Sequence, residues 1–365
     1  MKQKKMMAVL LTAGLAAMAF AGNVDAEESG SDYEVTDLLG RTVTIPAETS
    51  SYACIGPGAL RLYCYVADRA ELVGVEDAEV SWGSEGRPYT MSLGDVSDAM
   101  IIGPGGPGNA PDAELLFASE PDVIFTMYNS DASMVDELQE KTGIPVVTLS
   151  YGEVDVFDQA IYDSLELIGT ITGNTDRSSE VVKYMQDVQA DLETRTADLE
   201  EKPTVYLGCQ SNRGSHGIES TQGNYVLFDA LNIQNAAREA GIEEYAMIDK
   251  EQILEMDPEI ILIDAGGYEI LSEDYAANPE FYDSLSAVKD GSVYMQMPYN
   301  YYYTNIEIAL ADAYYIGSVV YPEVFSDINI AEKFDEISEF MLGITCYDDI
   351  AATNYGGYQQ VTLGQ

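Results

Sequence analysis

Lysine and arginine are scarce in this sequence. Its 365 residues include 17 basic side chains against 63 acidic ones, which gives a formal net charge of −46 at pH 7. A protein with this charge repels other polyanions, so nucleic acid and anionic lipid surfaces are excluded as partners. The few arginines become informative for the same reason, because arginines grouped in a cleft of an acidic protein indicate an anionic ligand.

Histidine, paired cysteines and catalytic motifs are also missing or rare. His216 is the one histidine, and no two of the four cysteines have the Cys-x-x-Cys spacing, so neither a structural zinc site nor a thioredoxin-like motif is expected. Cys54 and Cys64 lie in one half of the chain, and Cys209 and Cys346 lie in the other, which allows one disulfide in each half or four buried thiols. No known nucleophile, zinc-protease or dinucleotide motif occurs, so we expect a protein that is not an enzyme and needs no cofactor.

Only one long hydrophobic run is present, and it lies close to the start of the sequence. Three lysines precede an apolar stretch from Met6 to Phe20, and small side chains follow at Ala21 and Ala26. This is the layout of a secretory signal, and the stretch is shorter than the roughly 20 residues that span a bilayer. We predict a signal peptide over residues 1–26, with cleavage after Ala21 as the alternative, and a periplasmic or cell-surface location.

Strand-like and helix-like segments alternate along the rest of the chain, which predicts an α/β fold with mainly parallel sheets. One unit of this pattern occurs twice. Glu114 lies seven residues before Pro121, and Glu251 lies seven residues before Pro258, with a short apolar strand after each proline. In both copies a short helix has an acidic first turn and ends before the proline. The repeat predicts two similar lobes.

An amphipathic helix is predicted between the two halves. Apolar residues recur at three- and four-residue steps from Val181 to Leu199, and the segment from Asp176 to Leu199 contains no glycine or proline. At 1.5 Å per residue this helix would reach ~36 Å, which is enough to join two lobes. We therefore predict an N-terminal lobe over residues 32–172, a connecting helix over 173–201 and a C-terminal lobe over 202–365. Such a connection limits closure to small rocking motions.

Ligands of open parallel sheets bind at the carboxyl ends of the strands, so the loops that follow the predicted strands form the candidate site. Glycines in these loops let the backbone approach a ligand, arginines bind anions, and tyrosines suit flat ligands or ligate ferric iron. The candidate ligand-binding residues are Gly58, Arg61, Arg87, Tyr128, Arg213, His216, Tyr268, Tyr299, Tyr301 and Tyr302.

The segment from Thr36 to Pro46, the paired helix–proline–strand units and the central helix together resemble a known family. This is the iron-siderophore and cobalamin class of ABC transporter substrate-binding proteins, and the resemblance covers most of Asp32 to Gly343. It implies a Rossmann-like lobe on each side of a ligand cleft, a helical backbone joining the lobes, and delivery to the permease subunits of an importer. In that family one glutamate on each lobe meets arginines of the permease, and Glu114 and Glu251 match those positions.

The resemblance leaves the ligand open among a ferric siderophore, heme and a corrinoid. Because the arginines indicate an anion, we predict a monomeric binding protein that captures a ferric chelate and delivers it to an ABC importer. A corrinoid or heme is the near alternative. A chelatase-like enzyme with similar paired lobes is a more distant one, which turnover of a tetrapyrrole would reveal and which the shortage of histidine disfavours.

Overall fold

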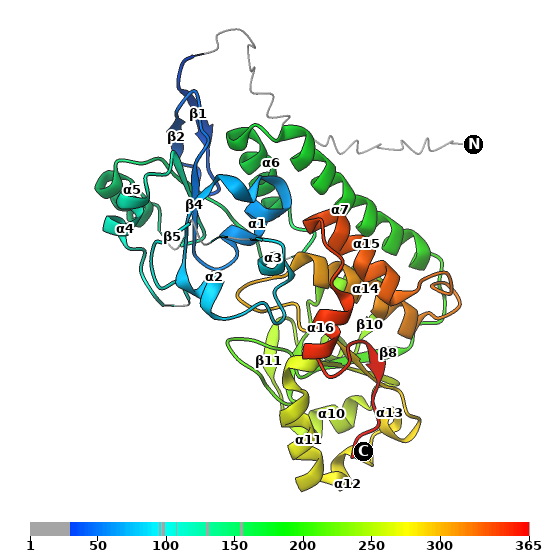
Figure 1. Cartoon of the computed structure of the whole chain (residues 1–365). Coiled ribbons are helices and arrows are strands. Elements are labelled where there is room, and N and C mark those ends of the chain that lie inside the picture. Colours follow the sequence, from blue (N-terminus) through cyan, green and yellow to red (C-terminus); the bar gives the residue numbers. More distant parts are fainter. Residues whose placement is uncertain are drawn as a thin grey trace, which may run out of the picture.

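The computed structural model describes residues 30–364, apart from residues 95, 97, 98, 107, 129, 130, 154 and 155. The predicted signal peptide, residues 1–26, lies outside the described residues. In the described ranges, no helix combines the length and the hydrophobicity that a membrane span requires. The chain forms two α/β lobes, and the long helix α7 (Thr175–Thr196) runs along one side of the molecule (Figure 1).

The N-terminal lobe contains a parallel sheet of five strands in the order β5-β4-β3-β6-β7. A two-stranded antiparallel hairpin, β1-β2, precedes this sheet. The strands of the lobe are β1 (Tyr33–Thr36), β2 (Thr42–Ile45), β3 (Tyr52–Ile55), β4 (Leu72–Val75), β5 (Met100–Ile101), β6 (Val123–Thr126) and β7 (Val146–Thr148). Its helices are α1 (Ala59–Val66), η1 (Arg69–Glu71), α2 (Asp77–Ser81), α3 (Pro88–Met91), α4 (Ala113–Ser119), α5 (Ala132–Thr142) and α6 (Gln159–Thr172).

The C-terminal lobe contains a second sheet, in the order β10-β8-β12-β13-β14, in which only the edge strand β14 is antiparallel. Strands β9 and β11 form a separate antiparallel pair. The strands are β8 (Thr204–Gly208), β9 (Ser220–Gln222), β10 (Gln234–Asn235), β11 (Tyr245–Met247), β12 (Ile260–Asp264), β13 (Val293–Gln296) and β14 (Gln359–Gln360). The helices are α8 (Val226–Ala230), α9 (Ala236–Glu239), α10 (Lys250–Met256), η2 (Ala265–Gly267), α11 (Tyr268–Ala277), α12 (Pro279–Tyr282), α13 (Ser286–Lys289), α14 (Ile306–Val320), α15 (Ile330–Leu342) and α16 (Tyr347–Thr353).

The two lobes share one topology. Four neighbouring strands correspond in order, β4-β3-β6-β7 in the N-terminal sheet and β10-β8-β12-β13 in the C-terminal sheet. In both sheets the strand of the repeated unit, β6 or β12, is third in this order. The repeated unit predicted from the sequence is therefore present in both lobes. Its helices α4 and α10 have aspartate N-caps, and both end at a residue in the left-handed conformation, Glu120 (φ 49°) and Asp257 (φ 36°).

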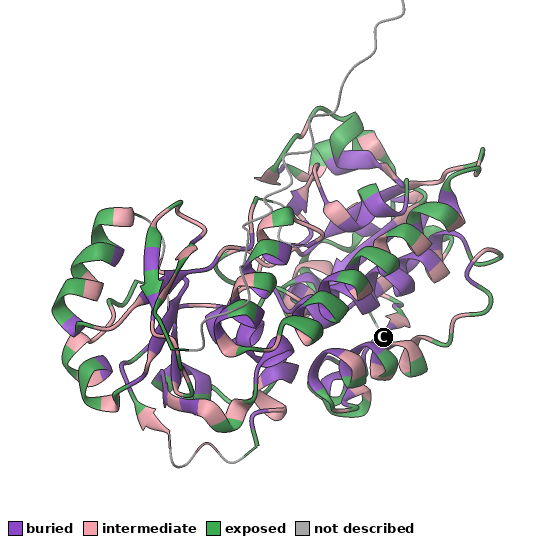
Figure 2. Cartoon of the chain, turned by 90° about the horizontal axis from the view of Figure 1, so that it is seen from above, coloured by how far each residue is buried: buried purple, intermediate pink, exposed green. Residues whose placement is uncertain are grey.

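One hydrophobic core extends through both lobes beneath α7. Alternate residues of each sheet face it, such as Tyr52 and Cys54 of β3 and Leu207 of β8, while their neighbours face two smaller clusters. Helix α7 packs against α1 and α6 of the N-terminal lobe and against α8 and α14 of the C-terminal lobe. In Figure 2 the helices show buried residues on their inner sides and exposed residues on their outer sides. The predicted connecting helix is thus present, and it joins the lobes through packing as well as through the chain.

A buried arginine adds a polar link between the lobes. Arg61 of α1 is fully buried, and its Nε donates to Oδ1 of Asn305 at 3.0 Å. Its Nη2 donates to the backbone carbonyls of Tyr301 and Tyr302, both at 3.1 Å. These three acceptors belong to the C-terminal lobe, so the arginine fastens the segment after β13 onto the N-terminal lobe.

The cysteines form no disulfide. All four are buried free thiols, which decides between the two arrangements that the sequence left open. Burial raises the pKa of Cys64 to about 12, so this thiol stays protonated and unreactive at neutral pH.

Replacing Arg61 with leucine should lower stability, because Oδ1 of Asn305 and the carbonyl of Tyr302 lose the donor that Arg61 provides. The expected loss is about 1–3 kcal/mol for a buried acceptor left without a partner. Chemical denaturation would measure it, with the exposed Arg213→Ala as the control that should leave stability within about 0.5 kcal/mol of the wild type. Equal midpoints for both variants would show that the cross-lobe contacts do not stabilise the fold.

The shared core also predicts a small change in shape on ligand binding. Closing the lobes by a large angle would break the packing of α7 against one of them, so the radius of gyration should hardly change. Small-angle scattering with and without saturating ligand measures this directly. A contraction of several ångströms would contradict the rigid connection.

Candidate ligand-binding site

A cavity of about 230 Å³ lies at the carboxyl ends of three neighbouring strands of the C-terminal sheet. Leu207 of β8, Asp264 at the end of β12 and Gln296 at the end of β13 line it. This is the edge at which parallel sheets place their ligands, because the chain leaves the strands there and its loops surround the space. The rest of the wall comes from the loops after β8 and β13 and from the β9-β11 pair.

Side-chain amides dominate the polar part of this wall. Gln210 donates from Nε2 to Oε1 of Gln222 at 2.6 Å, and Gln296 donates from Nε2 to the hydroxyl of Tyr225 at 2.9 Å. The carbonyl oxygens Oε1 of Gln210 and Gln296 are buried and accept no hydrogen bond from the described part of the chain. A buried acceptor without a donor is costly, so a ligand that carries hydrogen-bond donors would stabilise this wall.

Asp264 is the acidic group of the cavity. It is buried, and its carboxylate accepts a hydrogen bond from the backbone N–H of Gly266 at 2.8 Å. Burial raises its pKa to about 7, although this backbone hydrogen bond and one from Ser211 act in the opposite direction. Near neutral pH the group therefore exists in both forms, as a donor when protonated and as an acceptor when ionised.

Aromatic side chains form the remaining wall. Tyr225 and Tyr299 stack with their ring centroids 6.3 Å apart and an interplanar angle of 17°, and Tyr245 lines the same space. Asn300 follows Tyr299 and donates from Nδ2 to the carbonyl of Ser211 at 3.3 Å, which joins the loops after β13 and β8. Flat phenol faces beside amide groups suit a compact ligand with both apolar edges and polar oxygens.

The strand ends of the N-terminal sheet face this region but hold a side chain from the other lobe. The hydroxyl of Tyr302 donates to Oε2 of Glu76 at 3.2 Å and accepts from the N–H of Gly106 at 2.9 Å. Glu76 also accepts from the N–H of Gly56 at 2.8 Å and from the hydroxyl of Tyr128 at 3.0 Å. Burial raises the pKa of Glu76, which these hydrogen bonds partly offset. The phenol of Tyr302 therefore occupies the N-terminal half of the cleft.

The residues Tyr301, Tyr302 and Tyr303 after β13, here called the tyrosine segment, have an unusual backbone conformation. Tyr302 and Tyr303 have φ angles of 52° and 75°, in the left-handed region that side chains other than glycine rarely adopt. Such a conformation persists only where the surroundings hold it. The hydrogen bonds from Arg61 to the carbonyls of Tyr301 and Tyr302 supply that restraint.

The three arginines of the predicted site differ in their surroundings. Arg61 binds the tyrosine segment, and Arg87 is fully buried and pairs with Glu79, with Nη1 and Oε2 3.1 Å apart. Both guanidinium groups thus have protein partners, which differs from the expectation of arginines presented to a ligand. Arg213 is exposed and directly follows Asn212 in the loop that lines the cavity. Their roles in binding stay predictions.

The other predicted residues divide in the same way. Tyr299 lines the cavity, and the hydroxyls of Tyr128 and Tyr302 both donate to Glu76. Gly58 is the N-cap of α1 and has a φ of 90°. A Cβ added there would come within 2.8 Å of the Tyr151 ring. The remaining three do not line the cavity, although His216 contacts Asn212, which does. Nε2 of His216 is 2.8 Å from the carbonyl oxygen of Asn212, Tyr268 packs edge-on against Tyr355, and the Tyr301 ring lies 5.6 Å from the Arg87 guanidinium.

Sequence reasoning missed Gln210, Gln296, Asp264 and Glu76 as candidate residues. Asp264 and Gln296 are the last residues of their strands, so the rule that pointed to the loops would have found them if it had included the strand ends. Glu76 directly follows β4 and has the same signal. Gln210 lies two residues after the end of β8, in a loop that the rule did include, but its residue type alone did not mark it as a binding group.

Comparisons with known proteins agree with this architecture. The molybdate-binding protein MolA of Haemophilus influenzae is 21% identical over 359 residues, which cover 92% of this chain and 95% of that protein. The Fe(3+)-citrate-binding protein YfmC of Bacillus subtilis is 23% identical over 193 residues, or 52% of this chain and 58% of that protein. A solved periplasmic solute binding protein from Veillonella parvula has the same fold, with a TM-score of 0.69 at 20% identity over 88% of this chain and 96% of that one.

The family model described as periplasmic binding protein matches residues 93–298, which is more than half of the sequence and includes parts of both lobes together with α7. The chain therefore belongs to the periplasmic binding protein family, the solute-binding proteins of ABC importers.

Proposed function

We propose that this protein captures a compact ferric chelate, such as that of a small carboxylate siderophore, outside the cytoplasmic membrane and delivers it to an ABC importer. The observation that supports a compact ligand is the cavity at the ends of β8, β12 and β13, whose volume of about 230 Å³ is small. Drug-sized ligands occupy pockets of roughly 300–1,000 Å³, and heme and corrinoids need at least that much space. The cavity thus favours a small chelate over the tetrapyrrole alternative.

The chemistry of the wall supports a ligand with both donors and acceptors. The buried oxygens of Gln210 and Gln296 lack donors, and a chelate with hydroxyl groups or metal-bound water supplies them. The phenols and amide N–H groups around them can donate to its carboxylate oxygens. Protonation of Asp264, whose pKa burial raises to about 7, reduces the repulsion of an anionic chelate. Arg213, which is exposed and directly follows the lining residue Asn212, adds positive charge to this loop.

A small oxyanion is the second candidate. The similarity to the molybdate-binding protein MolA spans nearly the whole of both chains, and a cavity of this volume also accommodates a tetrahedral anion. Such an anion accepts hydrogen bonds from amides and phenols but offers no donor to the oxygens of Gln210 and Gln296. For this reason the chelate of the kind named for YfmC, ferric citrate, fits the wall better.

Thermal unfolding of the chain without residues 1–26 tests this proposal against ferric citrate, other ferric siderophores, molybdate, heme and cobalamin. Ferric citrate or a related small chelate should raise the melting temperature, since a ligand at a hundredfold its dissociation constant adds ~2.7 kcal/mol to stability. Metal-free citrate is the control and should have little effect. If molybdate alone stabilises the protein, the ligand is a small oxyanion and not a ferric chelate. If heme or cobalamin alone stabilises it, the inference from the cavity volume is wrong.

We also infer that Glu114 and Glu251 contact the permease. Both are exposed in the first turns of α4 and α10, the helices of the repeated unit. An acid in the first turn of a helix stabilises that helix by only about 0.3–1 kcal/mol. If these glutamates served folding alone, other residues could replace them at little cost in stability. Equivalent exposed acids on two lobes complement basic groups on two permease subunits.

Changing both Glu114 and Glu251 to alanine should leave ligand affinity intact and stability nearly so, yet abolish stimulation of the importer's ATPase in vesicles. Changing both to arginine should be more severe, because like charges then face each other. The control replaces Glu140 of α5 and Glu269 of α11, two exposed acids outside the repeated positions, with alanine. If the Glu114/Glu251 variant still delivers ligand normally, other surface acids carry the contact.

A further inference from the structure

We propose that Phe117 and Leu254 are a matched pair of apolar anchors, through which each lobe seats a nonpolar side chain of a permease subunit. This inference rests on the proposed permease contact of Glu114 and Glu251. It adds a specific hydrophobic contact to each acidic one and defines the partner surface as a basic group next to an apolar side chain.

The first support is a burial pattern that repeats in the two lobes. In α4 the residue two positions after Glu114 is fully buried, and the residue after that, Phe117, is 63% exposed. In α10 the residue two positions after Glu251 is likewise fully buried, and Leu254 is 40% exposed. The buried residue fixes the rotation of each helix on its lobe, so the exposed one necessarily faces outward.

The spacing places acid and apolar group on one patch. Residues three apart on an α-helix are neighbours on its surface, with Cβ atoms about 5–6 Å apart. Glu114 and Phe117 thus form one patch on the N-terminal lobe, and Glu251 and Leu254 form its counterpart on the C-terminal lobe. The two patches are topologically equivalent, because α4 precedes β6 and α10 precedes β12 at the same place in each sheet.

Single exposed apolar side chains are common on soluble proteins and need no explanation. Other large apolar residues of the described chain are exposed as well, including Met134 of α5 and Ile270 of α11. What sets Phe117 and Leu254 apart is that each lies one helical turn from Glu114 or Glu251, the two acids inferred to contact the permease, at the same position of a unit that occurs twice. A partner that presents the same surface twice, as a pair of like permease subunits does, accounts for such a repetition.

Each of these helices also borders a hollow, but only the hollow on the N-terminal lobe is lined by the acid and the apolar residue of its patch. On the N-terminal lobe, a hollow of about 810 Å³ is lined by Glu114 and Phe117 themselves, with Pro111 and Lys141. On the C-terminal lobe, a hollow of about 370 Å³ lies between α9 and α10.

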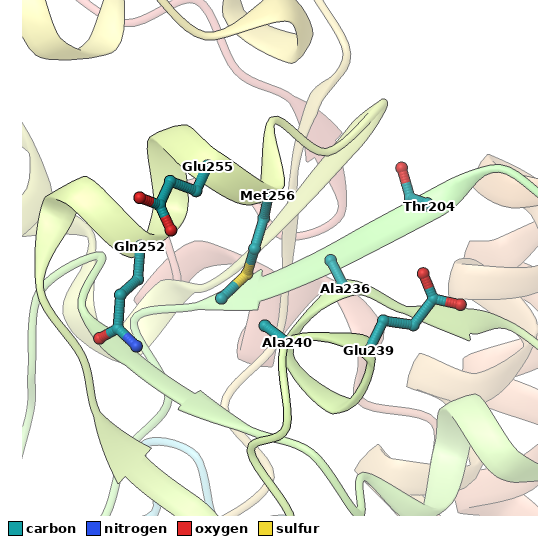
Figure 3. Close-up of a pocket in the computed structure, with 7 residues that line it drawn as sticks. All are labelled: Thr204, Ala236, Glu239, Ala240, Gln252, Glu255 and Met256. Atoms are coloured by element: carbon teal, nitrogen blue, oxygen red, sulfur yellow. The ribbon is translucent and has the colours of Figure 1, made fainter.

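Figure 3 shows the hollow on the C-terminal lobe. Ala236 and Ala240 of the α9 segment and Met256 of α10 give it an apolar floor, and Glu239 and Glu255 stand at its sides. This hollow lies beside the patch of Glu251 and Leu254, and its two carboxylates add negative charge that favours a basic partner surface. The partner that fits both patches is a permease segment that carries a basic residue beside an apolar one.

The test measures docking of the protein without residues 1–26 onto its importer in lipid nanodiscs, together with ATPase stimulation. The double variant Phe117→Ala/Leu254→Ala should raise the docking dissociation constant by about tenfold or more, as expected for side chains at the centre of an interface. The thermal shift with ferric citrate, used as the ligand probe, and the ligand-free melting temperature should not change.

Matched controls make the result specific. Val80→Ala/Met247→Ala removes two exposed apolar side chains from α2 and β11, which are not equivalent elements of the two lobes, and should dock like the wild type. Exchanging the pair, as Phe117→Leu/Leu254→Phe, keeps both sites apolar and should restore most of the affinity. Docking of the Phe117/Leu254 alanine variant at wild-type strength, while the Glu114/Glu251 variant fails to dock, would overturn this inference alone. Failure of the wild type to dock would overturn the proposed function with it.

Discussion

The apolar core beneath α7 is the constraint on which the rest of the structure depends. It is continuous from one sheet to the other, so the lobes form one packed unit rather than two independent domains joined by a linker. Separating them would expose apolar surface along the whole helix, and each buried side chain resists that by about 1.5–3 kcal/mol. The cleft edge, the tyrosine segment and the two repeated helices all keep their mutual positions because this core fixes them.

Periodic features of the fold were predictable from the sequence. Apolar residues at the helical period predicted α7, and the spacing from glutamate to proline predicted the repeated unit. Both features depend only on residues that are close in sequence. Helix α7 ends at Thr196, five residues before the predicted end at residue 201, and the N–H of Leu199 closes a turn on the carbonyl of Thr196 just after it. Helix ends depend on such local closures, which periodicity does not encode.

The site was less predictable, for a physical reason that Arg61 illustrates. Whether an arginine faces a ligand or the interior depends on its acceptors, and those of Arg61 lie about 240 residues further along the chain. No local pattern reveals that pairing. The amides of the cavity present the converse case, because Gln210 and Gln296 become distinctive only when burial leaves their oxygens without donors. The sequence pattern predicted that the ligand site lies at the carboxyl ends of the strands. Which side chains line the cavity there depends on the tertiary structure.

The tyrosine segment gives the molecule a built-in optical reporter. Trp82 is the only tryptophan in the sequence, and its ring lies 5.1 Å from that of Tyr302, edge to face, where the segment from the C-terminal lobe enters the N-terminal one. Its indole is partly exposed, so its emission is sensitive to the water and the aromatic ring beside it. Any event that withdraws the Tyr302 phenol from Glu76 and Gly106 changes that environment. The intrinsic fluorescence of the protein therefore follows the contact between its lobes without a label.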